Sequence, residues 1–237
     1  MTEISGWGRY PRHATELVEP SRPDRVAPLL AGSSGLVARG AGRAYGDAAI
    51  GERVTLSALR LDRMRAFDPA TGRLSVEAGV LLSDVIAAFQ PRGFFPPVVP
   101  GTKHVTVGGM IAADVHGKNH HRDGGFGGHV EALTLALPDG QVVECTRGDH
   151  AELFEATIGG MGLTGTILQA SFRLKPIETG WLRQQTIVAA DLDAAMDALR
   201  QSDGATYSVA WIDCVARGAS LGRSLIYLAE HATRDQF

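Results

Sequence analysis

The chain has 237 residues, 44% of them hydrophobic and 21% charged, so it is long enough to bury one large core or two smaller ones. Its net charge of −3, with no long basic run, argues against a dedicated nucleic-acid binder, which must neutralise phosphates. The two distant cysteines form no CxxC pair, so a disulfide framework is not expected and a reducing compartment is. We see no signal peptide and no apolar run of membrane length, and we expect a cytoplasmic protein or one peripheral to the cytoplasmic membrane.

The first third of the chain reads as short elements around a glycine-rich run. A helix is expected over residues 21–30, where a Ser and Pro start precedes apolar residues on one face. Strands are expected over residues 36–39 and 54–57, on either side of the run. Turn chemistry over residues 68–72, followed by the alternating segment 73–77, predicts a hairpin.

The middle of the chain alternates helices and strands. Helix 80–92 should end at Gly93, since glycine favours the left-handed residue that follows many helices. A long loop, 101–128, should contain one short helix over residues 108–115. The remaining elements expected before Pro176 are strands over 129–137 and 141–146, a helix over 151–158 and a strand over 164–175.

The pattern of apolar and polar residues changes after Pro176, and we place a domain boundary there, between residues 1–176 and 177–237. The second part shows one segment of helical periodicity between short apolar strands. Its expected elements are a strand over 181–188, a helix over 191–201 and strands over 207–213 and 225–228.

The glycine-rich run is the first candidate for chemistry. A strand that enters a tight glycine-rich turn presents consecutive backbone N–H groups, which bind phosphate oxygens. Arg39 and Arg43 could add charge, because arginine suits bidentate phosphate contacts. The plainer interpretation is a hairpin with surface arginines. The run is not the dinucleotide fingerprint, because a GxGxxG turn with a long helix and an acidic residue is absent.

A second candidate begins at Gly108 and Gly109, which open a helix of small residues. Its N-terminus could hold an anion through the helix dipole and unpaired N–H groups. Thr102 and Thr106 offer hydroxyl groups to a phosphate, and a face of small alanines would let a flat cofactor lie against the helix. The alternative is close helix packing, in which these small residues serve only contact distance.

Histidines are dense in the same loop, at positions 104, 116, 120, 121 and 129. His116 and His120 have the i, i+4 spacing with which a helix can bind zinc, so a metal hydrolase is an alternative. Gly117 and Asn119 disfavour a helix there, however, and no HExxH motif is present. We therefore expect no metal site, and histidines that donate to a cofactor or move protons beside it.

Several motifs occur together and in a consistent order along nearly the whole chain. They are Gly6, Trp7, Gly8 and Arg9; the run from Ala38 to Asp47; Pro100, Gly101 and Thr102; Thr106 to Gly109; His116, Gly117, Lys118, Asn119, His120 and His121; and residues 151–154 and 159–165. Together they resemble the decaprenylphosphoryl-β-D-ribose 2-oxidase family, which belongs to the vanillyl-alcohol-oxidase-like flavoproteins. The resemblance implies an α+β fold, with a two-lobed FAD-binding domain of the PCMH type over residues 1–176. The beginning of an α+β substrate domain, apparently incomplete, would follow over residues 177–237.

The resemblance also implies the roles of individual residues. The glycine-rich run would wrap the FAD pyrophosphate, residues 116–119 would lie beside the isoalloxazine ring, and Ile167 would pack on the cofactor. The FAD should be noncovalent, because Arg43 stands where covalent relatives often carry His. The implied catalytic residues are His116, Lys118 and Tyr45. The implied cofactor-binding residues are Ala38, Arg39, Gly40, Ala41, Gly42, Arg43, Ala44, Tyr45, Gly46, Asp47, Ala48, Gly101, Thr102, Thr106, Val107, Gly108, Gly109, His116, Gly117, Lys118, Asn119 and Ile167.

The reaction implied by the resemblance is oxidation of C2 of decaprenylphosphoryl-ribose to a 2-keto sugar, in the synthesis of cell-wall arabinan precursors. A hydride would pass to the flavin and a base would take the hydroxyl proton. The partners would be a lipid-linked sugar phosphate and an NAD-dependent reductase. Related oxidases are longer, so we expect this chain to correspond to their N-terminal portion. The alternatives are a sugar or alditol oxidase with a soluble substrate, or an inactive FAD-binding module.

Overall fold

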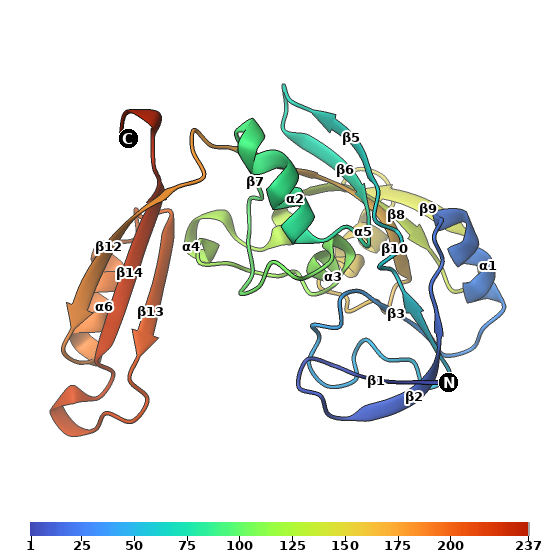
Figure 1. Cartoon of the computed structure of the whole chain (residues 1–237), viewed down its shortest axis with the longest axis horizontal. Coiled ribbons are helices and arrows are strands. Elements are labelled where there is room, and N and C mark those ends of the chain that lie inside the picture. The colour runs from blue at the N-terminus through green and yellow to red at the C-terminus, as the bar shows by residue number, and fades with distance from the viewer. Residues whose placement is uncertain (237) are drawn as a thin grey trace.

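The computed structural model describes residues 1–236 and contains four β-sheets. Two of them pack together into the larger part of the molecule, and a smaller sheet stands to one side (Figure 1). Within the described residues, no helix is long and apolar enough to cross a bilayer.

The first sheet belongs to the N-terminal lobe. In spatial order its strands are β1 (Thr2–Ser5), β2 (Arg12–Val18), β4 (Val54–Ser57) and β3 (Leu36–Arg39). β4 pairs in parallel with both β2 and β3. The loops that follow β3 and β4 therefore begin at the same end of the sheet. The predicted helix over 21–30 is a 3₁₀ turn, η1 (Pro23–Arg25), followed by α1 (Val26–Ala31).

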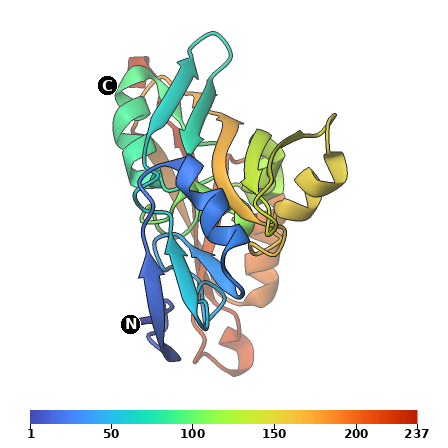
Figure 2. The ribbon, with the colours of Figure 1, turned by 90° about the vertical axis from the view of Figure 1, so that its right-hand side faces the viewer.

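The second sheet is antiparallel and forms the centre of the molecule. Its strands, in spatial order, are β5 (Met64–Asp68), β6 (Arg73–Glu77), β10 (Thr166–Arg173), β8 (Val130–Ala136) and β9 (Val142–Thr146). The β5–β6 pair confirms the predicted hairpin, which projects from the edge of this lobe (Figure 2). Asp68 stabilises the turn, since its carboxylate accepts from the Ala70 N–H and the Thr71 hydroxyl.

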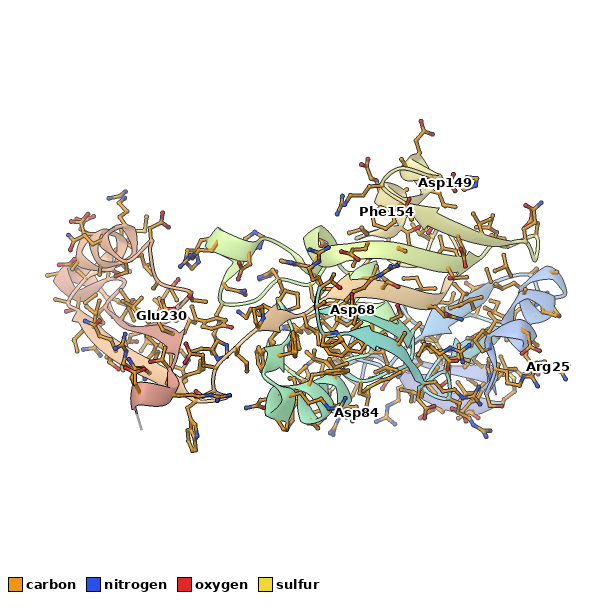
Figure 3. All side chains as sticks on the ribbon, turned by 90° about the horizontal axis from the view of Figure 1, so that it is seen from above. Arg25, Asp68, Asp84, Asp149, Phe154 and Glu230 are labelled. Atoms are coloured by element: carbon orange, nitrogen blue, oxygen red, sulfur yellow. The ribbon has the colours of Figure 1, made fainter. Side chains whose placement is uncertain are left out.

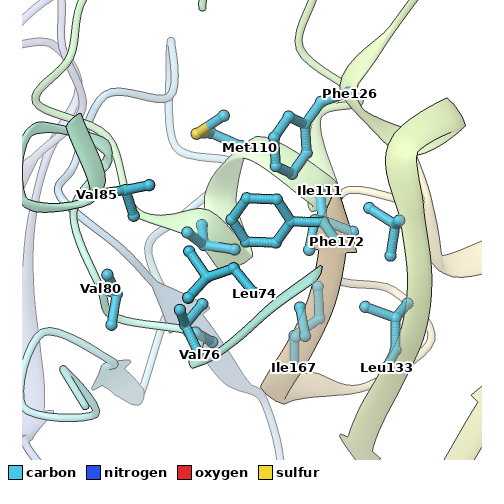
Figure 4. Close-up of a cluster of buried hydrophobic side chains, with 14 of the residues drawn as sticks. Leu74, Val76, Val80, Val85, Met110, Ile111, Phe126, Leu133, Ile167 and Phe172 are labelled. Carbon is cyan, nitrogen blue, oxygen red and sulfur yellow. The ribbon is translucent and has the colours of Figure 1, made fainter. Parts of the chain in front are cut away.

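Helices cover this sheet and complete the main core. They are α2 (Leu82–Phe89) with the 3₁₀ turn η2 (Gln90–Arg92), α3 (Val107–Ala112), α4 (His120–Asp123), η3 (Phe126–His129) and α5 (Ala151–Thr157). Leu74, Met110, Phe126 and Phe172 are among the fully buried side chains that meet between them (Figure 4). Gly93 follows η2 with φ of 81°, so the predicted glycine stop is confirmed.

The predicted helix over 108–115 is wrong at its C-terminal end. α3 ends at Ala112, and Asp114 takes a left-handed φ of 38°. The Val115 N–H donates to the Met110 carbonyl and the Asp114 N–H to the Ile111 carbonyl, which is the bonding of a Schellman stop. The Asp114 carboxylate also accepts from the Gly127 N–H, so contacts from outside the helix fix this end.

Past β10 the chain leaves the second sheet through β11 (Lys175–Pro176), which pairs with β7 (Phe94–Phe95). The predicted domain boundary lies in β11. The third large element is a three-stranded antiparallel sheet covered on one face by α6 (Leu192–Gln201). Its strands are β12 (Leu182–Ala189), β14 (Ser224–His231) and β13 (Tyr207–Ile212), and the short turns η4 (Gly218–Ser220) and η5 (Arg234–Gln236) lie outside them.

Candidate cofactor-binding site

A cavity of about 410 Å³ lies where the two lobes meet. Three segments supply most of its lining: the end of β3 with the loop that follows it, the helix α3 with its flanking residues, and the segment from Met161 into β10. Its walls are mainly apolar and built from small residues, among them Ala58, Ala78 and Ala112. A concave, mostly apolar cavity of this size suits a small molecule with flat rings, provided that polar groups fix its orientation.

The glycine-rich loop supplies such polar groups from its backbone. Among the described residues, none of the backbone N–H groups of residues 40–46 donates a hydrogen bond to a protein acceptor. Gly42 and Gly46 carry positive φ values of 67° and 60°, which let the chain turn repeatedly within this run. Consecutive N–H groups in such a turn form a concave anion site, so this loop can bind a phosphate or diphosphate.

Arg39 holds this loop from the protein side. Its Nη2 donates to the Ser5 carbonyl at 2.7 Å and its Nη1 to the Ala49 carbonyl at 3.3 Å. Burial, and then the nearby charge of Arg43, lowers the pKa of the Arg39 guanidinium. The Trp7 N–H also donates to the Ala44 carbonyl at 2.8 Å, so the N-terminal segment fixes the loop as well.

Arg43 differs from Arg39 because its side chain is exposed at the cavity. Its guanidinium carbon lies 5.0 Å from the centre of the Trp7 ring. We expected both arginines to add charge for a phosphate. Because both Arg39 nitrogens above bond to carbonyls, Arg43 is the better placed of the two to meet an anion.

The expectation of unpaired N–H groups at the N-terminus of α3 is wrong. The Val107 N–H donates to the Val80 carbonyl at 2.9 Å, and the Gly108 N–H donates to the Ala78 carbonyl at 2.8 Å. The next donor, Gly109 N–H, bonds to Oγ1 of the N-cap Thr106 at 3.2 Å. The first turn therefore has its hydrogen bonds satisfied within the protein, and it offers an anion little beyond its dipole.

Close packing explains the glycines around α3. A Cβ on Gly108 would lie 2.9 Å from the Ala78 Cβ, and one on Gly40 would lie 2.2 Å from Thr106 Oγ1. Gly40 belongs to the first lobe, whereas Thr106 belongs to the second. The small residues thus set the distance between the lobes, and with it the width of the cavity.

The histidine loop lies beside the cavity. Val115 lines the cavity, and His116 follows it with an exposed side chain. The His116 and His120 rings meet edge to face, with centroids 5.4 Å apart. Over residues 1–236, no three His, Cys, Asp or Glu side chains are grouped so that they could hold a metal ion.

Asn119 has a structural position in this loop. It is 1% exposed, and its Nδ2 donates to the Pro97 carbonyl at 2.7 Å and also to Asp123. Its Oδ1 is buried and has no partner among the described residues. A Cβ on Gly117 would lie 2.9 Å from that oxygen, so Gly117 is needed for the loop to close around Asn119.

The structure brings part of the predicted cofactor set together. The predicted residues that line the cavity are Ala38, Arg39, Gly40, Ala41, Gly42, Arg43, Ala44, Tyr45, Ala48, Thr106, Gly108, Gly109 and Ile167. Those outside its lining are Gly46, Asp47, Gly101, Thr102, Val107, His116, Gly117, Lys118 and Asn119. The side chain of Val107 is fully buried in the core, so only its backbone could meet a ligand.

Sequence reasoning did not include a further group of lining residues. They are Ala49, Ala58, Ala78, Val105, Met110, Ala112, Ala113, Val115, Met161, Gly162, Gly165 and Thr166. The glycine-rich motif over residues 159–165 could have indicated Met161, Gly162 and Gly165. The face of small alanines expected on the helix after Gly109 indicated Ala112 and Ala113. No local signal marks Ala58 and Ala78, because they reach the cavity only when the lobes pack.

A second group of polar residues lies at the junction with the three-stranded sheet and was not predicted. Lys175 Nζ donates to Tyr207 Oη at 2.5 Å, and Tyr207 Oη lies 3.1 Å from His231 Nε2. They flank a second cavity of about 300 Å³, which Lys175 and His231 line together with Glu230 (labelled in Figure 3).

Burial dominates the electrostatics of this junction cluster. It lowers the pKa of the Lys175 ammonium and raises the pKa of the Tyr207 hydroxyl, with the charges of Asp123 and Glu230 raising both. Burial, and then the charge of Lys175, also lowers the pKa of His231. A neutral His231 can accept from the tyrosine hydroxyl while the tyrosine oxygen accepts from Lys175.

Residues 18–146 match the FAD-binding domain family. The chain is 38% identical to decaprenylphosphoryl-beta-D-ribose oxidase of Mycolicibacterium smegmatis over 98% of its own length and 53% of that protein. It is 30% identical to cytokinin dehydrogenase 7 of Oryza sativa subsp. japonica, over 76% of this chain and 37% of the relative. It is 29% identical to L-gulonolactone oxidase of Mus musculus, over 58% of this chain and 31% of that relative. The chain spans about half the length, or less, of these relatives.

These matches confirm the resemblance and the α+β fold with an FAD-binding domain. The cavity fits FAD on its own chemistry. The unpaired N–H groups of residues 40–46 suit the diphosphate, and the exposed Arg43 adds positive charge beside them. The small apolar residues of the walls suit flat rings.

Proposed function

The chain belongs to the FAD-binding domain family, and on that premise we propose that it is the cofactor-binding portion of an oxidoreductase that oxidises a secondary hydroxyl group of a sugar. The observation that carries the proposal is the cavity at the glycine-rich loop, where residues 40–46 leave their N–H groups to a ligand. When bound, FAD supplies the two-electron acceptor that no side chain can supply. The protein holds it, orients the substrate and moves the hydroxyl proton.

The substrate that we propose is decaprenylphosphoryl-ribose, oxidised at C2 to the 2-keto sugar. The 38% identity to a decaprenylphosphoryl-beta-D-ribose oxidase, which extends over 98% of this chain, supports it. The product would then be reduced by an NAD-dependent partner enzyme, completing an epimerisation for cell-wall arabinan precursors. The enzyme would work in the cytoplasm or at the cytoplasmic membrane.

The loop after α3 supports roles for His116 and Lys118. Val115 lines the FAD cavity, whereas the Lys118 carbonyl accepts from the Ser208 N–H of the three-stranded sheet at 2.9 Å. This loop therefore spans from the cofactor to the sheet, and the side chains of His116 and Lys118 are exposed between them. We assign these two residues to electrostatic support of the cofactor and to proton transfer.

Tyr45 is the third proposed catalytic residue. Its side chain is 78% exposed at the cavity edge, on the loop whose N–H groups face the cofactor. A phenol in that position can donate a hydrogen bond to a substrate hydroxyl group or accept one from it.

A second candidate is a sugar or alditol oxidase with a soluble substrate, which the 29% identity to L-gulonolactone oxidase favours. The FAD cavity does not discriminate between the two, because it would hold the same cofactor in either enzyme. A third is an FAD-binding module that lacks activity by itself.

The experiment that tests these proposals starts from the visible spectrum of the purified chain, before and after acid precipitation. We expect flavin bands that move to the supernatant, since Arg43 offers no covalent attachment point. Anaerobic addition of decaprenylphosphoryl-ribose should bleach the bands, whereas L-gulonolactone should not. A folded chain that stays colourless with added FAD would contradict the proposal, and a yellow chain that no sugar bleaches would favour the inactive module.

Variants then test the assigned residues. His116→Gln and Lys118→Met should keep the flavin spectrum and slow bleaching by a factor of about 100. His150→Gln is the matched control, because His150 is also an exposed histidine but neither it nor its chain neighbours line the cavity. Equal rates in all three variants would exclude His116 and Lys118 from the chemistry.

A further inference from the structure

Met161 has a backbone conformation that disfavours its own side chain. Its φ is 53°, in the left-handed region, and its side chain is 49% exposed where the loop lines the FAD cavity. Gly159 and Gly162, on either side, also have positive φ, at 71° and 81°. Glycine adopts this conformation without strain, whereas a residue with a Cβ does so at a cost in free energy. Strained residues of this kind concentrate at functional sites.

The backbone contacts of this loop do not require methionine. The Gly159 N–H donates to the Ile111 carbonyl at 3.0 Å, and the Met161 N–H donates to the Ala112 carbonyl at 2.8 Å. These bonds fasten the loop to the end of α3, and so hold residue 161 in its conformation. A glycine at position 161 could make the same bond without strain, so the reason for methionine lies in its side chain.

We infer that Met161 is a cofactor-contacting residue whose thioether side chain packs against an aromatic ring of FAD. The inference rests on the proposed function, because it deepens the assignment of that cavity. The other lining residues near Met161 cannot cover a ring, since Ala112, Ala113 and Gly162 have small side chains or none. A long, unbranched thioether adapts to the ring that it covers, and sulfur makes favourable contacts with aromatic rings.

The test is the variant Met161→Gly in the full chain, with two readouts on apoprotein. FAD affinity, followed by quenching of flavin fluorescence, should fall about tenfold because the apolar contact is lost. The midpoint of thermal unfolding without FAD should rise by about 2 °C, because the strain is relieved. A residue with only a structural role would not give greater stability together with weaker binding.

Three further variants separate strain from contact. Met161→Ala keeps the strained φ but removes the long side chain, so it should lose affinity without the thermal gain. Met161→Leu keeps an apolar side chain of similar size and should retain affinity. Leu163→Ala is the exposure control: Leu163 is 88% exposed nearby in the same loop but does not line the cavity, so its affinity should not change.

FMN, which lacks the adenine ring, identifies the ring that Met161 covers. A tenfold loss for both FAD and FMN would support contact with the flavin, and a loss for FAD alone would support contact with the adenine. FAD binding by Met161→Gly within twofold of the unsubstituted chain would overturn the inference. Failure of the unsubstituted chain to bind FAD would overturn the proposed function, and this inference with it.

Discussion

The FAD cavity and the junction with the three-stranded sheet use opposite means of holding their parts together. At the cavity, backbone N–H groups without protein partners and small residues form the site that we propose for FAD, and the strained or close-packed positions are Gly40, Gly108 and Met161. At the junction, side chains make the contacts, through Lys175 and Tyr207. The comparison teaches that the first region should respond to added volume, whereas the second should respond to lost hydrogen bonds and to pH.

The largest effect should come from adding one methyl group between the lobes. In Gly40→Ala the new Cβ would lie 2.2 Å from Thr106 Oγ1, so the threonine must move and α3 loses its N-cap. We expect the free energy of unfolding to fall by about 2–3 kcal/mol and FAD affinity to fall more than tenfold. Urea unfolding and flavin titration measure the two.

Gly148→Ala is the control for that variant, because a Cβ there meets nothing within 4 Å and the residue is exposed. It should change stability by less than about 0.5 kcal/mol. Equal stability of the two variants would show that the lobes are not packed as closely at Gly40 as the structure has them.

Removal of the tyrosine hydroxyl at the junction should have a smaller effect, which lowers the stability of the protein but leaves its FAD affinity unchanged. Tyr207→Phe leaves the half-buried Lys175 without its acceptor and His231 without a partner on Nε2. We expect a loss of about 1–2 kcal/mol in the free energy of unfolding. FAD affinity should stay within twofold, because Tyr207 does not line the FAD cavity.

Tyr227→Phe is the matched control on the same sheet, since no hydrogen bond of the Tyr227 hydroxyl is found in the described part of the chain. Its stability should match that of the unsubstituted chain. A junction that tolerates both substitutions equally would remove the distinction drawn between the two regions.

The smallest effect should be a pH dependence carried by His231. Its pKa in the folded protein is lowered from 6.5 by burial and by Lys175, so the unfolded chain binds the proton more readily. The contribution of neutral His231 is complete above pH 6.5 and is lost as the pH falls from there through the lower pKa of the folded state. His231→Gln should flatten the stability profile between pH 7 and pH 5. An unchanged slope in urea unfolding would place this pH dependence elsewhere.

Local patterns predicted the elements that local chemistry controls. Strands β3, β4 and β6 lie at the residues predicted for them, and Gly93 follows the helical segment as expected. β1 and β2 were not predicted, because β2 is a polar segment that fully buries only Thr15 and pairs with a strand far along the chain. Asp114 ends α3 early for a comparable reason, since its partner is the distant Gly127.

The candidate site likewise has features that local sequence predicted and features that only tertiary contacts determine. The run of residues 40–46 predicts a phosphate-binding turn, because Gly42 and Gly46 permit the backbone conformation that exposes N–H groups. The role of Arg39 in holding the loop could not be predicted. Its guanidinium meets the Ser5 carbonyl only once the N-terminal strand has folded beside it.

The sequence by itself predicted a glycine-rich turn, and the order of its motifs along the chain carried the resemblance to FAD-binding proteins that the family match confirms. The tertiary structure decided which residues share the cavity, and it brought Met161 and the alanines together from separate segments. It also decided that the N–H groups of α3 are occupied, whereas those of residues 40–46 are not. The physical reason is that a hydrogen-bond partner or a packing neighbour is fixed by distance in space, and distant segments meet only when the two lobes pack.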